Sequence, residues 1–156
     1  MAIHRFERSQ TIRATVEEAW AFFSNPANLR EITPTELGFE VLSDVPPQIY
    51  AGLMIEYRVR PLFGIPMNWL TEITQVEDGR FFVDEQRVGP YAIWHHEHRF
   101  SSLPDGRLEI HDLITYAPPF GVLGEIIHPF LIAPQLEKIF AHRNKVVAAR
   151  FPDAPK

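Results

Sequence analysis

The chain has 156 residues, a length typical of one domain with a substantial core, and its 46% hydrophobic and 22% charged residues are ordinary values for a globular protein. A formal net charge of -5 argues against nucleic acid as the main partner, because phosphate binding needs clustered Lys and Arg. Without cysteine, the chain can form no disulfide, thiolate nucleophile or zinc–thiolate site.

The N-terminal residues MAIHRFERSQ are charged from the fourth residue on, which is not the pattern of a signal peptide. No apolar run approaches the roughly 20 residues of a membrane span. We therefore expect a cytoplasmic protein that forms one domain over residues 1–156, with no prediction of its oligomeric state.

The first third of the chain is predicted to hold one strand and two short helices. Residues 3–13 have the mixed polarity of a strand. Thr15 and Glu18 have the spacing of a capping box, which predicts a helix that begins at Val16. A second short helix is predicted over residues 26–32, because proline is favoured in the first turn of a helix.

From about residue 38 the hydrophobic period changes to two, which predicts strands. The predicted strands cover residues 53–60, 67–76, 81–88, 91–101 and 107–117. Glu77-Asp78-Gly79 has the composition of a three-residue hairpin loop with glycine in the left-handed conformation. These strands are expected to form an antiparallel meander.

The last segment, residues 120–150, is apolar at helical spacing, with Leu136, Ile139, Phe140 and Val147 on one face. Two prolines, at positions 129 and 134, are expected to kink this helix or split it in two. Helices segregated to one side of an antiparallel sheet define an α+β fold. A curved sheet closed over by a long amphipathic helix leaves a concave space between them.

The stretch FFVDEQRVGPYAIWHHEHRF, residues 81–100, combines three histidines and three acids with aromatic residues. If Gly89-Pro90 is a two-residue loop, Glu85 faces Trp94. If the next turn pairs Phe100 with Leu108, His96 faces Asp112. In these registers the inner face holds Phe81, Val83, Glu85, Trp94, His96, His98, Phe100, Leu108, Ile110, Asp112, Ile114 and Tyr116. The opposite face, with Asp84, His95, Glu97, Arg99, Glu109 and His111, forms cross-strand charge pairs typical of a solvated surface.

Several short motifs resemble a ligand-binding branch of the START-like (SRPBCC, Bet v 1-like) superfamily. In chain order they are FFSNPANL, WLTEI, FVDEQ, GPY, WHHEHRF, DLITY and IFAHR. The resemblance implies a helix-grip fold, in which about seven antiparallel strands wrap around a long C-terminal helix and enclose a deep hydrophobic cavity. Members of the superfamily bind lipids, sterols, polyketides and plant hormones, and some are cyclases or aromatases. The Gly-rich loop of the plant allergen group is missing here, so the ligands of that group are not carried over.

The favoured hypothesis is a carrier or sensor that encloses one small apolar molecule, such as a lipid, a polyketide or another apolar metabolite. An aromatic concave face with a few convergent polar groups is the usual composition of a small-molecule site. His96, Asp112 and Glu85 are expected to fix the polar end of the ligand. The candidate ligand-binding residues are Tyr57, Trp69, Glu85, Trp94, His96, His98, Asp112 and Tyr116.

Three other functions are weighed against this one. A cyclase or dehydratase would use His96 as a general acid–base oriented by Asp112, although no nucleophile is evident beside the pair. A protein-interaction module would use the outer face of the sheet. A metal site would combine His96 and His98 with Asp112 or Glu85. A histidine pair on a strand more often belongs to an internal network, so no metal or other cofactor is expected.

Overall fold

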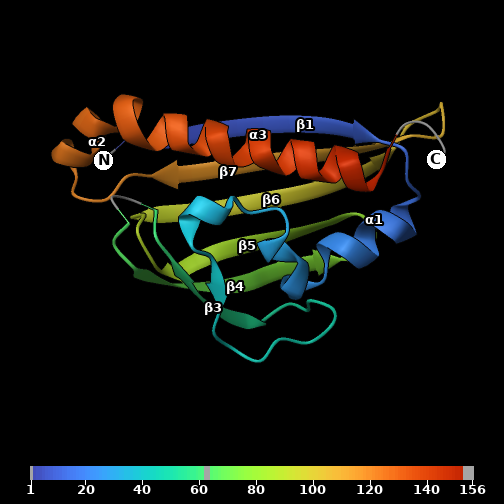
Figure 1. Ribbon diagram of the computed structural model, residues 1–156, viewed down its shortest axis with the longest axis horizontal. Coiled ribbons are helices and arrows are strands. Elements are labelled where there is room, and N and C mark those ends of the chain that lie inside the picture. Colours follow the sequence, from blue (N-terminus) through green and yellow to red (C-terminus); the bar gives the residue numbers. More distant parts are fainter. Residues whose placement is uncertain (1, 62–63, 153–156) are drawn as a thin grey trace.

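A seven-stranded antiparallel sheet faces a long C-terminal helix in the computed structural model, which describes residues 2–61 and 64–152 (Figure 1). In sheet order the strands are β1 (His4–Ile12), β7 (Leu108–Ala117), β6 (Ile93–Ser102), β5 (Phe81–Val88), β4 (Met67–Glu77), β3 (Met54–Val59) and β2 (Glu40–Val41). The first strand therefore lies beside the last one, and the strands between them follow one another as a meander. This is the predicted α+β helix-grip arrangement.

The capping box predicted at the start of the first helix is present. Helix α1 (Val16–Phe23) is preceded by Thr15, whose hydroxyl accepts a hydrogen bond from the Glu18 backbone N–H at 3.1 Å. The Glu18 carboxylate in turn accepts from the Thr15 N–H at 2.9 Å. The next predicted helix is instead a 3-10 helix, η1 (Pro26–Arg30), followed by a shorter one, η2 (Thr35–Leu37). Such tight turns are common in short connecting segments.

The C-terminal helical run is continuous from Val122 to Arg150, so its two prolines do not split it. It comprises α2 (Val122–Ile127), the π-helical turn η3 (His128–Ile132) and α3 (Ala133–Arg150). Pro129 lies in η3. The wider turn there tolerates proline, which has no backbone N–H to donate. Pro134 comes directly after this turn, which ends with the Ala133 N–H bonded to the His128 carbonyl.

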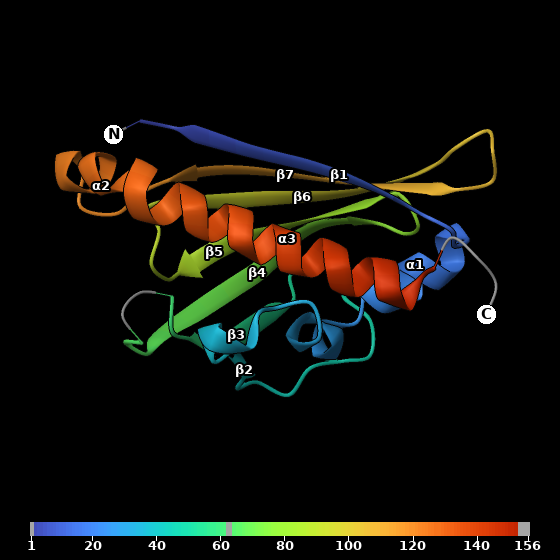
Figure 2. The same ribbon diagram turned by 45° about the horizontal axis from the view of Figure 1, so that its top comes forward.

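Helix α3 crosses the concave face of the sheet (Figure 2). Leu136, Phe140 and Val147 are buried against the sheet, and Ile139 is partly buried beside them, as predicted. The ring of Phe140 lies 4.8 Å from that of Phe6 on β1. This apolar stripe holds the helix above the sheet, and Leu136, Ile139 and Phe140 also line a cavity between the two layers.

The register between β5 and β6 differs by one residue from the predicted one. Glu85 pairs with His95 rather than Trp94, and Asp84 pairs with His96. The loop has four residues, 89–92, because the side-chain amide of Gln86 bonds both the N–H and the C=O of Tyr91, at 3.1 and 2.7 Å. A slip of one residue reverses the faces of a strand. Asp84 therefore lies on the inner face and Glu85 on the outer face, the reverse of the prediction.

The register between β6 and β7 differs from the predicted one by two residues, which preserves the faces. Phe100 pairs with Ile110, and His98 rather than His96 lies opposite Asp112. His96 still reaches Asp112 diagonally, with 3.0 Å between His96 Nε2 and Asp112 Oδ1. The predicted contact between these two side chains is therefore present, although the predicted register is wrong.

Candidate functional site

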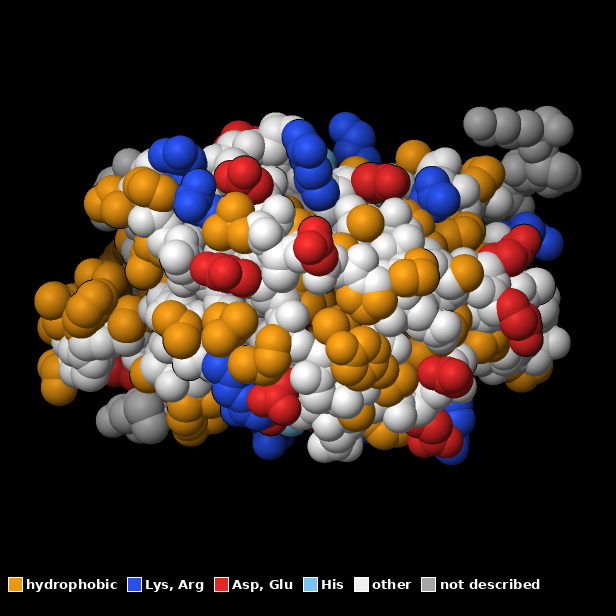
Figure 3. Space-filling view, turned by 90° about the horizontal axis from the view of Figure 1, so that it is seen from below, with side chains coloured by type: hydrophobic (Ala, Val, Ile, Leu, Met, Phe, Trp, Pro, Cys, Tyr) orange, Lys and Arg blue, Asp and Glu red, His pale blue; other side chains and the backbone are white. Residues whose placement is uncertain are grey.

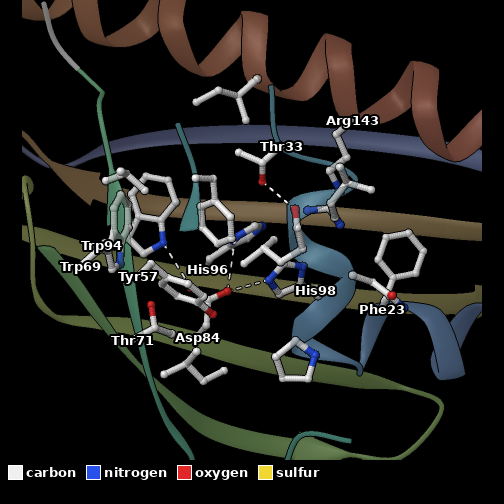
Figure 4. Close-up of a pocket in the computed structure, with 18 of the residues that line it drawn as sticks. Phe23, Thr33, Tyr57, Trp69, Thr71, Asp84, Trp94, His96, His98 and Arg143 are labelled. Carbon is white, nitrogen blue, oxygen red and sulfur yellow. Dashed lines mark hydrogen bonds and ion pairs between the residues drawn. The ribbon is translucent and has the colours of Figure 1, made fainter. Parts of the chain in front are cut away.

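A cavity of about 210 Å³ lies between α3 and the concave face of the sheet. Its wall is mainly aromatic and aliphatic, with Phe23 from α1, Tyr57 from β3, Trp69 from β4 and Phe140 from α3 among the lining residues. Figure 4 shows a polar group, centred on Asp84, that faces this apolar space from the sheet. An apolar cavity with a few convergent polar groups is the composition expected of a small-molecule site.

The cavity adjoins a surface hollow, and the two share Leu37, Pro61, Gln135 and Ile139. We infer that these shared residues form the mouth of the cavity. Across this mouth the side-chain amide of Gln135 on α3 donates a hydrogen bond to the backbone carbonyl of Pro61. The bond ties the helix to the segment after β3, so it must open for a large molecule to pass at this point.

Exposed apolar side chains gather at the end of the molecule that carries α2, which is at the left of Figure 3. They are Phe120, Val122, Leu123, Ile126 and Phe130. Phe130 also lines the surface hollow beside the cavity mouth. This end of the protein is therefore more apolar than an ordinary solvated surface.

The polar group in the cavity wall consists of two imidazoles between two carboxylates. Asp84 Oδ2 lies 2.7 Å from His98 Nε2 and 3.5 Å from His96 Nδ1. Asp112 Oδ1 lies 3.0 Å from His96 Nε2 and 3.0 Å from His98 Nδ1. The Trp94 indole N–H donates to Asp84 Oδ1 at 3.3 Å. Each imidazole thus has one nitrogen toward Asp84, as Figure 4 shows for His96 and His98, and the other toward Asp112.

Arg143 on α3 supplies a cation to this group. Its Nη2 lies 3.0 Å from Asp112 Oδ1, and its side chain is 7% exposed. The guanidinium also lies over the rings of Phe23 and Phe140, at 5.3 and 5.4 Å from their centroids. Such contacts are favourable for a cation that is removed from water. The buried charge of Asp112 is therefore balanced by a side chain from the opposite layer of the fold.

The electrostatics of the group keep both carboxylates ionised. Burial by itself would raise the pKa of Asp112, but the Arg143 charge and the contacts with His96 and His98 hold that pKa well below 3.8. Burial would also raise the pKa of Asp84, but the contacts with His98 and His96 lower it. Burial and the neighbouring His98 charge lower the pKa of His96 to about 4. For His98 the burial penalty is outweighed by Asp112 and Asp84, which raise its pKa.

Five of the eight predicted ligand-binding residues line the cavity: Tyr57, Trp69, Trp94, His96 and His98. Asp112 is buried behind the imidazoles, where it can act on a ligand only through them. Tyr116 is buried outside the lining, and its hydroxyl bonds His128 Nε2 at 2.8 Å. Whether the lining residues contact a ligand stays a prediction.

Glu85 does not reach the cavity, so its predicted place on the inner face is wrong. Its carboxylate lies 2.8 Å from His95 Nδ1 and 3.0 Å from Arg87 Nη1, both on the outer face. Arg87 in turn contacts Glu72 at 2.6 Å. The cause is the one-residue slip in the register of β5.

Two residues of the site, Asp84 and Arg143, are not among the site residues predicted from the sequence. Asp84 was placed outside by the wrong register. Arg143 had a detectable signal, because the spacing from Phe140 to Val147 places it on the same apolar stripe of α3. A buried cation on such a stripe indicates a buried anion opposite it.

This fold and site place the chain in a known class of proteins. Residues 12–136 match the family model described as "Polyketide cyclase / dehydrase and lipid transport", so the chain belongs to that family. No curated protein matches it.

The solved structures that resemble the chain have the same fold. A START superfamily protein from Mycobacterium smegmatis has a TM-score of 0.68 and 10% identity, with 95% of this chain and 97% of that one covered. Protein Ms6760 from the same organism has a TM-score of 0.66 and 15% identity over 94% and 92% of the chains. Ara h 8.0201 has a TM-score of 0.58 and 15% identity, with 94% of this chain and 99% of that one covered. At these identities the similarity establishes the START-like helix-grip fold alone.

Within residues 2–61 and 64–152, no helix has both the length and the apolar character that a bilayer crossing requires.

Proposed function

We propose that the protein binds one small apolar molecule in the cavity between α3 and the sheet, as a carrier or a sensor. The observation that carries the proposal is the cavity itself, an apolar space with the two imidazoles and Asp84 facing it from one side. Apolar surface favours the body of such a ligand. The family description, which includes lipid transport, supports the same class of ligand.

The size of the cavity favours a compact ligand. Its volume of about 210 Å³ is below the roughly 300–1,000 Å³ typical of drug-sized ligand sites. A polyketide fragment or another small aromatic metabolite suits this space better than a lipid with long acyl chains. Native mass spectrometry of the purified protein would reveal a co-purifying ligand and its mass.

The polar end of the ligand is expected to bond His96. Its Nδ1 faces the cavity side of the polar group at 3.5 Å from Asp84, longer than a normal hydrogen bond. A ligand hydroxyl can donate to either of these atoms, because the Nε2–H of a neutral His96 donates to Asp112 and leaves Nδ1 as an acceptor. Asp112 orients the imidazole from behind, since His96 Nε2 lies within hydrogen-bond distance of its carboxylate.

A displacement titration with a neutral, environment-sensitive apolar dye tests the proposal. Trp94→Ala should weaken dye binding by roughly tenfold, because a large part of the apolar wall is lost. Asp112→Asn should leave dye binding nearly unchanged. For a ligand that bonds His96, the same change should weaken binding by about 1–3 kcal/mol, the cost of a mispaired buried polar group.

Tyr50→Ala serves as the matched control, because it removes an exposed aromatic side chain outside the cavity. This variant should bind the dye like the wild type. Equal dye affinity in the wild type and Trp94→Ala would exclude this cavity as the binding site.

A cyclase or dehydratase activity is the second candidate, favoured by one observation. His96 lines the cavity, is held by Asp112 and has a pKa lowered to about 4, so it is neutral at pH 7 and can accept a proton. The family description also includes cyclases and dehydrases. Turnover of a polyketide-like substrate that is abolished by His96→Gln, with dye binding retained, would favour this activity over simple binding.

The remaining partner and location assignments stay predictions. The net charge of -5 supports a small-molecule partner rather than nucleic acid. We also infer that residues 1–156 act as one domain in the cytoplasm.

A further inference from the structure

Three potential metal-ligand atoms converge on one point of the cavity wall. They are Asp84 Oδ2, His96 Nδ1 and His98 Nε2, and all lie within 4.8 Å of one another. The two histidines are two positions apart on β6 and share its inner face, and Asp84 lies opposite His96 on β5. Two imidazoles and a carboxylate are a common ligand set for divalent transition metals.

The imidazole nitrogens that point away from Asp84 both lie beside Asp112. His96 Nε2 and His98 Nδ1 each lie 3.0 Å from the same oxygen, Asp112 Oδ1. A histidine that binds a metal through one nitrogen almost always donates its other N–H to a carboxylate, carbonyl or water, which sets its tautomer and orientation. Asp112 can perform this role for His96, whereas His98 Nδ1 lies 3.0 Å from the same oxygen without hydrogen-bond geometry, and the opposite nitrogens of both rings are directed at Asp84.

The carboxylates are themselves held in place. The Trp94 indole N–H donates to Asp84 Oδ1, which leaves Oδ2 directed at the imidazoles. Arg143 Nη2 lies 3.0 Å from Asp112 Oδ1. The two carboxylates and the Arg143 guanidinium leave a formal charge of -1 before the imidazoles are counted, and a metal ion would bind the neutral form of each imidazole.

We propose that Asp84, His96 and His98 bind one divalent first-row transition metal ion of the Zn²⁺ or Fe²⁺ type, with its open coordination positions facing the apolar cavity. A tetrahedral ion with bonds of about 2.0–2.1 Å separates its ligand atoms by about 3.3 Å. Asp84 Oδ2 and His96 Nδ1 already lie 3.5 Å apart, and the 2.7 Å contact with His98 need only widen by a side-chain rotation.

This inference replaces the sequence-based expectation of a metal-free network. That expectation offered Glu85 or Asp112 as the third ligand, but Glu85 lies on the outer face and Asp112 holds the far side of both rings. The actual register of β5 places Asp84 in the third position. The metal would use the same nitrogen, His96 Nδ1, that we assign to the polar end of the apolar ligand, so with the metal bound that end would face the open coordination positions instead. The test of the metal site uses no organic ligand.

Zinc titration of the full-length protein tests the site without any organic ligand. The protein is first treated with a chelator and exchanged into chelator-free buffer, and Zn²⁺ is then added in an isothermal titration calorimeter. We expect about one Zn²⁺ per chain, and we expect Asp84→Asn to weaken binding at least tenfold. Asp112→Asn should also weaken it by about 10–100-fold, because it removes the group that orients the His96 imidazole.

Glu85→Gln is the matched control, since it neutralises the adjacent acid on the opposite face of the same strand. It should bind Zn²⁺ like the wild type. In the wild type, Zn²⁺ should shift the imidazole NMR signals of His96 and His98 and leave those of His95 and His111 in place. This second measurement keeps the test decisive if Asp84→Asn does not fold. No stoichiometric binding, equal binding in a folded Asp84→Asn, or shifts confined to His95 and His111 would overturn the proposal.

Discussion

Arg143 is the group whose removal should most directly reveal the buried charges of the site. Arg143→Met keeps most of the aliphatic length of the side chain and removes only the guanidinium. Breaking a buried ion pair from one side costs about 3–5 kcal/mol, since the remaining charge loses its partner. His96 and His98 stay beside Asp112 at 3.0 Å, which places the expected loss near the lower end of that range.

Two aromatic contacts add to this loss. The guanidinium lies 5.3 Å from the Phe23 ring centroid and 5.4 Å from that of Phe140, and such contacts contribute about 0.5–1 kcal/mol each at exposed sites and more when buried. We therefore expect the free energy of unfolding to fall by about 3–5 kcal/mol in total. Urea unfolding followed by circular dichroism, with a chelator present, measures this free energy. The comparison is valid if the m value is the same in the wild type and the variant.

A second substitution separates the charge effect from loss of packing. If the loss comes from an unpaired Asp112, Asp112→Asn introduced into Arg143→Met should recover part of the stability, with a coupling energy of about 1–3 kcal/mol. Arg150→Met is the control on the same helix. Its side chain is 50% exposed, its ion pair with Glu31 is long, at 3.8 Å, and its contact with the Phe22 ring, at 4.4 Å, is that of an exposed cation, so this variant should lose about 1 kcal/mol.

Two outcomes would refute this reasoning. One is a loss in Arg143→Met no larger than that in Arg150→Met. The other is strict additivity of Arg143→Met and Asp112→Asn, which would mean that the two side chains do not interact.

Three further predictions concern the core, the tyrosines and the cavity mouth. Phe140→Ala should lower the free energy of unfolding by about 3–5 kcal/mol, because Phe140 is 3% exposed, and a loss below about 1 kcal/mol in urea would contradict its place in the core. Burial raises the pKa of both Tyr57 and Tyr91 above 10, so the folded protein keeps protons that the unfolded chain loses. Stability should therefore be greatest below pH 10 and fall as the pH rises past it, with a smaller fall in Tyr57→Phe, as measured by urea unfolding at pH 9 and 11. Gln135→Ala removes the hydrogen bond across the mouth and should speed dye release about fivefold in stopped-flow fluorescence, whereas an unchanged rate would place the exit elsewhere.

The order and type of the elements were readable from the sequence, because they depend on local patterns. The capping box at Thr15, the period of two along the strands and the apolar stripe at Leu136 and Phe140 each act within a few residues. Motifs along the chain also indicated the START-like helix-grip fold, which the family match and the structural similarity support. The aromatic residues Tyr57, Trp69 and Trp94 were correctly placed on the concave face, since a period of two assigns the faces within each of their strands.

The composition of the polar group was decided only by the tertiary structure. A side-chain amide, that of Gln86, shifts the β5–β6 register by one residue, and this exchanges Glu85 for Asp84 at the cavity wall. Arg143 lies 31 positions after Asp112 in the sequence, and only the packing of α3 across the sheet brings the two charges within 3.0 Å. Strand register depends on contacts across a turn, and buried ion pairs depend on contacts between layers. The local residue pattern therefore does not determine the strand register or the partners of a buried ion pair.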